Sequence, residues 1–166
     1  MAQIDLKQAT VTIKDGAAHT LEIRIGEGNL NYTETKNMEY KLNRGLLDEV
    51  REGDEAPIDV TFDFVWDYLR GPSSVSGSGG TPTIEDALKQ VGAAAAWTSS
   101  DSDACRPYAV DLVILYTPDC STGDQEEITL PDYRFESLAH DLSAGTVASS
   151  GKCNATNAIV VRAAQS

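Results

Sequence analysis

The chain has 166 residues, enough for one domain with a hydrophobic core, and its 41 % of hydrophobic residues argues against wholesale disorder. A formal net charge of −13 excludes a protein that grips nucleic acid through clustered lysines and arginines. No run approaches the ~20 apolar residues of a membrane helix, and the N-terminus lacks the apolar segment of a signal peptide. We therefore expect synthesis and folding in a cytoplasm, without membrane insertion.

The first elements expected along the chain are two strands. Apolar and polar residues alternate over 9–14 and again over 19–25, which is typical of half-buried strands. Asp15 and Gly16 lie between them, and this dipeptide favours a tight hairpin turn. His19 is expected at the start of the second strand.

One or two strands are expected next, over residues 30–43. Alternation there predicts that Met38, Tyr40 and Leu42 face the core while the polar residues between them face solvent. The strongly acidic stretch 44–56 then breaks the alternation. We predict a long charged loop over this stretch.

The segment 57–69 has the clearest strand pattern of the chain. Its apolar and aromatic face comprises Ile58, Val60, Phe62, Phe64, Trp66 and Tyr68. Its other face comprises Asp59, Thr61, Asp63, Val65, Asp67 and Leu69. Aspartate is a poor strand former, so three of them in one row indicate a face that tolerates or uses negative charge.

A loop and a helix follow. Residues 71–82 are rich in Gly, Ser and Pro, which predicts a flexible surface loop within a single domain spanning 1–166. A helix is expected from residue 84, because Thr83 and Asp86 have the spacing of a capping box. Gly92 is a candidate for its end, although the alanines after it could extend it.

The last third of the chain again predicts strands. Residues 107–117 form an apolar run, and 127–142 form a strand that Pro131 bends or places at an edge. Residues 145–156 and 158–164 end the chain as strands. The fold class expected from all elements is mainly β: an antiparallel β-sandwich or barrel with one flanking α-helix.

Catalytic, metal and cofactor sites find no support in the motifs. Asp59 and Asp63 lie about 13 Å apart along one strand, beyond the ~5 to 9.5 Å of a glycosidase pair or the reach of one shared metal ion. His140 lies near Ser137 and Asp141, but no nucleophile elbow accompanies it. We expect a non-enzyme with no metal and no cofactor, in which His140 bonds to the backbone of a strand or turn.

The three cysteines, Cys105, Cys120 and Cys153, have no zinc-site spacing. One interpretation is free thiols in a reducing compartment. The other is a disulfide between Cys105 and Cys120, which bracket one predicted strand.

Several stretches together resemble the major tail tube proteins of long, non-contractile-tailed bacteriophages, those of siphovirus type. The stretches are GEGNLNYTETKNMEYKLNRGLLDEVREGDEAPIDVTFDFVWDYL, PYAVDLVILYTPDC, ITLPDYRFESLAHDLSAGTV and SGKCNAT. The likeness covers residues 9 to 162 in phrase and order, and it contains no catalytic signature. The loop at 71–82 and the terminal arms have no counterpart in it.

The resemblance implies a structural virion protein with the tail tube fold. In that family, subunits form hexameric rings whose inner sheets join into one β-barrel, and the rings stack into a hollow tube for ejection of double-stranded DNA. It implies assembly in the host cytoplasm into a virion tail. The partners implied are further copies of the chain, a tape-measure protein, a tail terminator, and distal tail or baseplate proteins, with DNA passing through without specific binding.

Two groups of site residues follow from the resemblance. A tube that conducts DNA should repel phosphates, so we hypothesise a lumen face containing Asp59, Thr61, Asp63 and Asp67. The acidic loop is the candidate for contact between rings or subunits, with these residues: Arg44, Leu46, Leu47, Asp48, Glu49, Val50, Arg51, Glu52 and Asp54.

Two other functions remain open on the residues alone. One is an interaction module on a phage or bacterial surface, such as a decoration protein or a carbohydrate-binding β-sandwich, which would need an exposed aromatic platform. The other is an acid-rich hydrolase, which would need two carboxylates brought together across strands.

Overall fold

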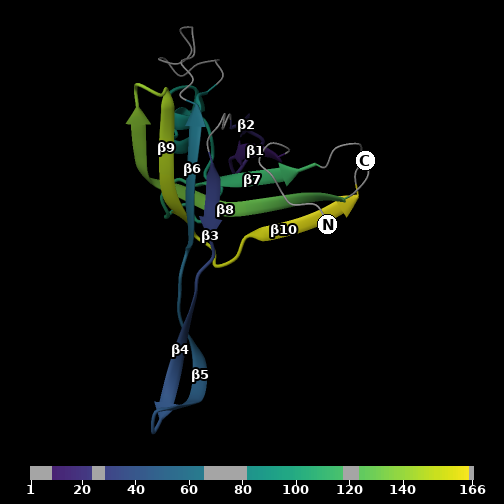
Figure 1. Ribbon diagram of the computed structural model, residues 1–166. Helices are drawn as coiled ribbons and strands as arrows, with labels where there is room; N and C mark the ends of the chain where they lie inside the picture. The colour runs from purple at the N-terminus through teal and green to yellow at the C-terminus, as the bar shows by residue number, and fades with distance from the viewer. Residues whose placement is uncertain (1–8, 24–28, 66–81, 118–123, 165–166) are drawn as a thin grey trace.

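A computed structural model describes residues 9–23, 29–65, 82–117 and 124–164. The fold is mainly β, antiparallel, with one short helix, as the sequence predicts (Figure 1). In chain order its elements are β1 (Ala9–Lys14), β2 (Thr20–Glu22), β3 (Leu30–Thr33), β4 (Lys36–Asn43), β5 (Leu46–Glu55), β6 (Ile58–Val65), α2 (Ile84–Lys89), the 3₁₀ helix η2 (Gly92–Ala94), β7 (Val110–Tyr116), β8 (Asp124–Asp141), β9 (Thr146–Cys153) and β10 (Ile159–Ala164).

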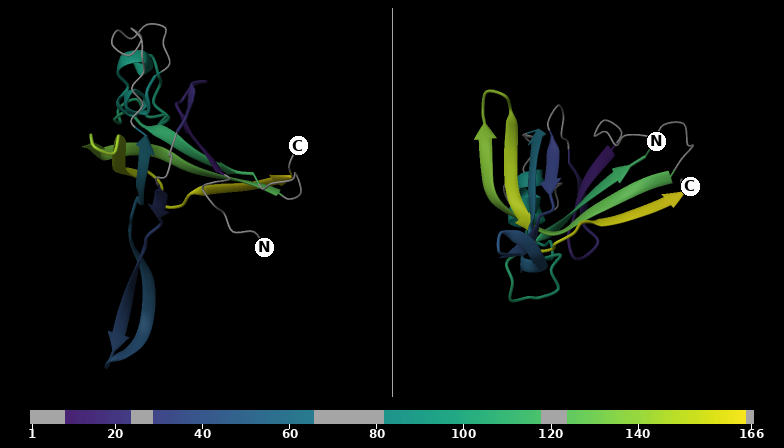
Figure 2. Two further views of the ribbon diagram at one scale, coloured as in Figure 1. Left: turned by 45° about the horizontal axis from the view of Figure 1, so that its top comes forward. Right: turned by 60° about the horizontal axis from the view of Figure 1, so that its bottom comes forward.

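Eight strands form one sheet that bends into two layers. The strand order is β2-β1-β7-β8-β9-β6-β3, with β10 also paired to β8. The long strand β8 belongs to both layers: its first half pairs with β7 and β10, and its second half pairs with β9. The second half of β8, together with β9, β6 and β3, is hereafter the four-strand layer. Figures 1 and 2 show how it crosses the layer of β1, β7 and β10.

The bend in β8 lies at Pro131 and Asp132. The pairing of β7 with β8 skips these two residues, because Leu112 faces Leu130 and Val110 faces Tyr133. Proline has no amide hydrogen for the ladder, and Asp132 has a φ of 54°. The backbone N–H of Asp132 instead donates to Oδ1 of Asp111 at 3.0 Å. Of the two alternatives predicted for Pro131, an edge or a bend, the structure has the bend, which directs β8 from one layer into the other.

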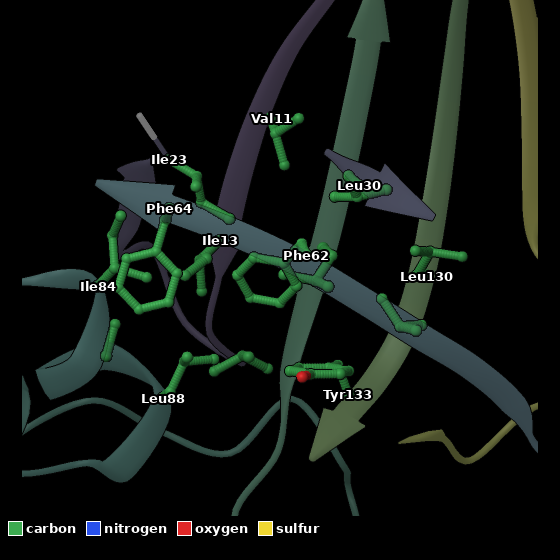
Figure 3. Packing of buried hydrophobic residues seen from close by; sticks show 14 of the residues in the cluster. Val11, Ile13, Ile23, Leu30, Phe62, Phe64, Ile84, Leu88, Leu130 and Tyr133 are labelled. Atoms are coloured by element: carbon green, nitrogen blue, oxygen red, sulfur yellow. The ribbon is translucent and has the colours of Figure 1, made fainter. Parts of the chain in front are cut away.

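The hydrophobic core lies between the two layers and is closed by the helix (Figure 3). The alternation predicted for 57–69 is confirmed over β6, where Ile58, Val60, Phe62 and Phe64 are at most 2 % exposed. The Phe62 ring lies 5.7 Å from that of Tyr133, which comes from β8 just past its bend. Burial of these side chains holds the bent sheet together.

The helix α2 begins as the sequence predicts. Oγ1 of Thr83 accepts from the backbone N–H of Asp86 at 3.1 Å, and Oδ2 of Asp86 accepts from the N–H of Thr83 at 3.3 Å. This capping box satisfies amides that the first turn leaves open. The helix ends at Gln90, whose φ of 58° is left-handed, before Gly92. The alanines after Gly92 therefore do not extend it.

A buried aspartate ties the β1–β2 turn to the segment after the helix. The side chain of Asp15 is fully buried and accepts from the backbone N–H groups of Ala17, His19 and Thr98, each at 3.0 Å. Nδ1 of His19 lies 2.6 Å from its second oxygen, and the His19 ring stacks on Trp97. Burial raises the pKa of Asp15, but the hydrogen bonds from Thr98, His19 and Ala17 outweigh it, and the pKa is lowered overall.

Replacing Asp15 with Asn should therefore destabilise the protein. We expect Asp15→Asn to lower the free energy of unfolding by about 3 kcal/mol at pH 7, because buried amides lose a charged acceptor. The lowered folded-state pKa means that the contribution is full above the unfolded value of about 3.9 and is lost as pH falls through the folded value. Urea denaturation at pH 7 and pH 3 measures the free energy of unfolding of both proteins. The difference between the wild type and Asp15→Asn should be smaller at pH 3 than at pH 7. The exposed Glu22→Gln in the same hairpin is the control, and an equal loss in both variants would contradict the assignment.

Residues 44–56 do not form the predicted loop. Residues 46–55 are strand β5, which forms a separate two-stranded hairpin with β4. Its turn consists of Arg44 and Gly45, with φ of 54° and 84°, the positive values of a type I′ turn. The prediction failed because acidic residues disfavour strands on average, whereas cross-strand charge pairs here offset that preference.

The predicted burial of Met38, Tyr40 and Leu42 is also wrong. All three are exposed, with 64 % of Tyr40 accessible. The hairpin projects away from the two layers, so neither of its faces meets the core (Figure 1). The alternation in 36–43 correctly indicates a strand with an apolar face, but no other part of the described chain covers that face.

Candidate assembly surfaces

The first candidate surface is one face of the β4–β5 hairpin. Strand registry places five apolar side chains on this face: Met38, Tyr40, Leu42, Leu47 and Val50. We call these residues the apolar hairpin face. Their exposed fractions range from 41 % to 75 %. Grouped exposed apolar side chains mark interaction sites more often than solitary ones do.

The opposite face of the hairpin carries charge. Nε of Arg51 lies 2.6 Å from Oε2 of Glu39 directly across the two strands. At the base of the hairpin, Lys36 lies 2.8 Å from Glu52, the cross-strand partner of Met38, so this pair borders the apolar hairpin face and lowers the pKa of Glu52. The hairpin is therefore amphipathic. Its charged side can remain solvated, whereas its apolar side is suited to burial against another surface.

The second candidate surface is the outer face of the four-strand layer, which points away from the core. Its side chains on β3, β6 and β9 are Asn31, Thr33, Asp59, Thr61, Asp63, Val65, Thr146, Ala148, Ser150 and Lys152. Seven of these ten are Asn, Asp, Ser or Thr. Oδ1 of Asp59 lies 3.8 Å from Nζ of Lys152, across the β6–β9 pair.

The same layer has an open edge on each side. Strand β3 pairs with β6 on one side only within the described chain. The pairing of β8 with β7 ends at Tyr133, so no described strand lies beside Glu136–Ala139 on the side away from β9. Open edges present unpaired backbone donors and acceptors to other chains.

The third candidate surface is strand β10. It pairs with β8 over 124–129, and no described strand lies on its other side. Ile159 and Val161 share one face of β10 with Glu127 of β8, whereas Val160 lies on the other face beside Ile128, and each of the three is about half exposed. A β-branched apolar edge of this kind is a hazard for a monomer unless another chain covers it.

Three of the four residues predicted to face the lumen lie on the same face of one strand. Asp59, Thr61 and Asp63 share the outer face of β6, the first two exposed and the third half-buried. Asp67 lies outside the described residues. Whether this face lines a lumen stays a prediction.

The residues predicted for contacts between copies all lie on the β4–β5 hairpin. Arg44 is in the turn, and Leu46–Asp54 lie along β5. Leu47 and Val50 belong to the apolar hairpin face, whereas Leu46 lies opposite Asn43 on the charged side. The sequence reasoning missed the contribution of β4, although the alternation in 36–43 contained the signal.

The cysteine and histidine predictions have different outcomes. Cys105 is exposed, and Cys120 lies outside the described residues, so their pairing stays a prediction. Cys153 is buried, and desolvation, with smaller contributions from Asp111 and Asp132, raises the pKa of its thiol to about 12. Nε2 of His140 lies 3.3 Å from Oε1 of Glu85, and the expected bond of His140 to the backbone stays a prediction.

Residues 9–23, 29–65, 82–117 and 124–164 contain no group of three or more His, Cys, Asp or Glu placed to hold a metal ion. Neither of their helical segments has the length and hydropathy of a membrane span.

No protein-family model and no curated protein sequence matches the chain. Solved structures do match its fold. A chain in the sheath/tube terminator of the PVC extracellular contractile injection system, extended state, has a TM-score of 0.56 and 12 % identity over 97 % of this chain and 98 % of that chain.

A chain of the anti-feeding prophage tube-terminating cap has a TM-score of 0.55 and 10 % identity over 98 % of this chain and 93 % of that one. A chain of the PVC sheath-tube complex has a TM-score of 0.50 and 11 % identity over the same shares. This protein therefore has a fold found in the tube and terminator assemblies of contractile injection systems.

Proposed function

We propose that the chain is a structural subunit of a phage-type tail tube. The observation that carries this proposal is the four-strand layer, which combines two open edges with an outer face of small polar side chains. A sheet with these properties is suited to joining its own copies edge to edge. Its outer face then lines a water-filled hole.

Because the two edges are different, a contact between them can close a ring. Pairing β3 of one copy with the second half of β8 in the next is a heterologous contact, which generates a ring when the rotation closes. Closure into a barrel pairs every edge of the layer and removes the hazard of open strands. The resemblance in sequence supports hexameric rings stacked into a tube of siphovirus type.

The hairpin extends this arrangement beyond one ring. Strand β3 leads into β4, and β5 leads into β6, so the hairpin continues past the end of the four-strand layer (Figure 2). In a ring it would project beyond the rim toward a neighbouring copy. Its apolar face would be buried there, which is favourable at ~25 cal/mol per Å².

The lumen face suits the passage of double-stranded DNA. Over β6, β8 and β9, the register places Asp59, Asp63 and Asp141 on this face with two cations, Lys152 and Arg134, so the face is net negative. The guanidinium of Arg134 also pairs with Asp101. Phosphates are repelled by such a wall, so DNA would slide rather than bind. The partners proposed with this role are a tape-measure protein, a tail terminator and distal tail or baseplate proteins, assembled in the host cytoplasm into a virion tail.

A surface module that binds carbohydrate receives less support. Phe62 and Phe64, its candidate aromatics on β6, are buried in the core. Trp66 lies outside the described residues. The exposed Tyr40 lies among aliphatic side chains of the hairpin and does not form an aromatic platform.

Negative-stain electron microscopy of the purified protein across a concentration series tests the proposal. We expect hollow tubes or stacked rings above a critical concentration, because each copy gains several weak contacts at once. Isolated rings that do not stack would assign the chain to the end of a tube. Monodisperse single subunits over the whole series would contradict the proposal.

A further inference from the structure

Two exposed apolar surfaces on this chain have no partner among the described elements. One is the apolar hairpin face, and the other is β10. Of the other large apolar side chains that are exposed in the described part of the chain, Leu46 lies on the charged side of the hairpin, and neither Val91 nor Leu142 has an exposed apolar neighbour in sequence. Among the residues that the structure describes, the hairpin and β10 are therefore the two apolar clusters that an assembly has to cover.

The two clusters cannot cover each other within one copy. The hairpin extends in the direction of β3 and β6, whereas β10 runs along the other layer on a different side of the body (Figures 1 and 2). Contact between them joins one copy to the next through two different surfaces. A contact of this heterologous type propagates through an assembly instead of stopping at a dimer.

Charge matches the two surfaces to each other. Glu127 lies directly across from Val161 in the β8–β10 pair, so it borders the β10 cluster. Arg44 lies at the tip of the hairpin beside Leu42 and Leu47. Neither Arg44 nor Glu127 has an ion-pair partner within the part of the chain that the structure describes.

The backbone at Arg44 is a second indication that its side chain has a role. Its φ of 54° is a conformation that Gly, Asn and Asp adopt most readily in a type I′ turn. A long cationic side chain is not the residue that turn geometry prefers. A residue held in such a conformation points to a function for its side chain.

We propose that the apolar hairpin face of one copy docks on β10 of a second copy, with Arg44 against Glu127. This inference rests on the proposed function and names the surface that receives the hairpin. The apolar area on the two sides is on the order of several hundred Å², below the ~1,200 Å² of a stable isolated complex. Single contacts are then too weak to hold a dimer, and many of them act together in a tube.

Engineered cysteines test the contact. Leu47→Cys and Val161→Cys are combined in a chain carrying Cys105→Ser and Cys120→Ser, and the protein is assembled and mildly oxidised. We expect a reducible ladder of oligomers on a denaturing gel. The matched control replaces Leu47→Cys with Glu49→Cys, which lies on the charged side of the hairpin and should give no ladder.

A charge exchange provides an independent measurement. Arg44→Glu alone and Glu127→Arg alone should each raise the critical concentration for assembly about tenfold, and the double variant should restore it to within about threefold. Both substitutions are at the surface, and circular dichroism checks that the fold is retained. A double variant whose critical concentration rises by the product of the two single increases would overturn the pairing of Arg44 with Glu127.

The failures of the two proposals are distinguishable. If the wild-type chain forms tubes but the variant with Leu47→Cys and Val161→Cys gives no ladder, the docking site on β10 is wrong. The proposal that the chain is a tube subunit is then retained. A ladder that appears equally with Glu49→Cys also overturns the docking site. If the wild-type chain never assembles, both proposals fall.

Discussion

Shortening the β4–β5 hairpin is expected to abolish assembly while leaving a folded subunit. Met38 and Glu52 are cross-strand neighbours, so residues 39–51 can be replaced by an Asn-Gly turn that joins them. The body should lose less than about 1 kcal/mol, because the hairpin lies outside the core. Assembly should fail even at a hundredfold higher concentration, because four of the five side chains of the apolar hairpin face are gone.

Thermal denaturation followed by circular dichroism measures the fold, and light scattering with electron microscopy measures assembly. The matched control is the double substitution Glu39→Ser and Arg51→Ser on the charged side of the hairpin. It removes one exposed ion pair, which contributes about 0.5 kcal/mol, and should leave the critical concentration within about threefold. Tubes formed by the shortened chain at the wild-type concentration would refute a role for the hairpin in assembly.

Reversing the charge of the outer face of β6 is expected to slow DNA ejection from assembled particles. Asp59→Lys with Asp63→Lys turns a repelling wall into one that binds phosphates, repeated in every copy around the tube. We expect ejection at least tenfold slower at low ionic strength, with partial recovery as salt screens the contacts. Asp67→Lys belongs to the same hypothesis and is added as a third substitution.

Fluorescence of a DNA-binding dye during triggered ejection measures the rate. The pair Asp59→Asn with Asp63→Asn is the neutral control and should change the rate far less, because it adds no cation. A second control, Glu22→Lys, adds a cation on β2, away from the four-strand layer. Wild-type ejection rates in the Asp59→Lys, Asp63→Lys particles would show that this face does not line the path of DNA.

The prediction of β6 succeeded because a strand buried on one face must alternate, and the alternation of Ile58, Val60, Phe62 and Phe64 is visible without any neighbour. The helix start at Thr83 and Asp86 was predictable for a similar reason, since a capping box is a local motif. The bend at Pro131 follows from the missing amide hydrogen of proline. Each of these features depends on residues close together in the chain.

The β4–β5 hairpin could not be predicted correctly from residues close together in the chain. The residues of β4 alternate as core residues do, yet alternation reports that a face is apolar and does not report what covers it. The residues of β5 are so acidic that they indicate a loop, and the pairing of Glu39 with Arg51 is a contact between residues distant in sequence. Two local patterns were thus misread because their outcome depends on pairing across strands.

By itself, the sequence determined the antiparallel β class, the short helix, the bend in β8 and the row of aspartates on one face of β6. The tertiary structure alone decided that β8 bends one sheet into two layers and that the four-strand layer keeps an open edge on each side. It also decided that the apolar hairpin face lies outside the core. The reason is that propensity and periodicity are local, whereas burial and sheet edges depend on which distant strands become neighbours.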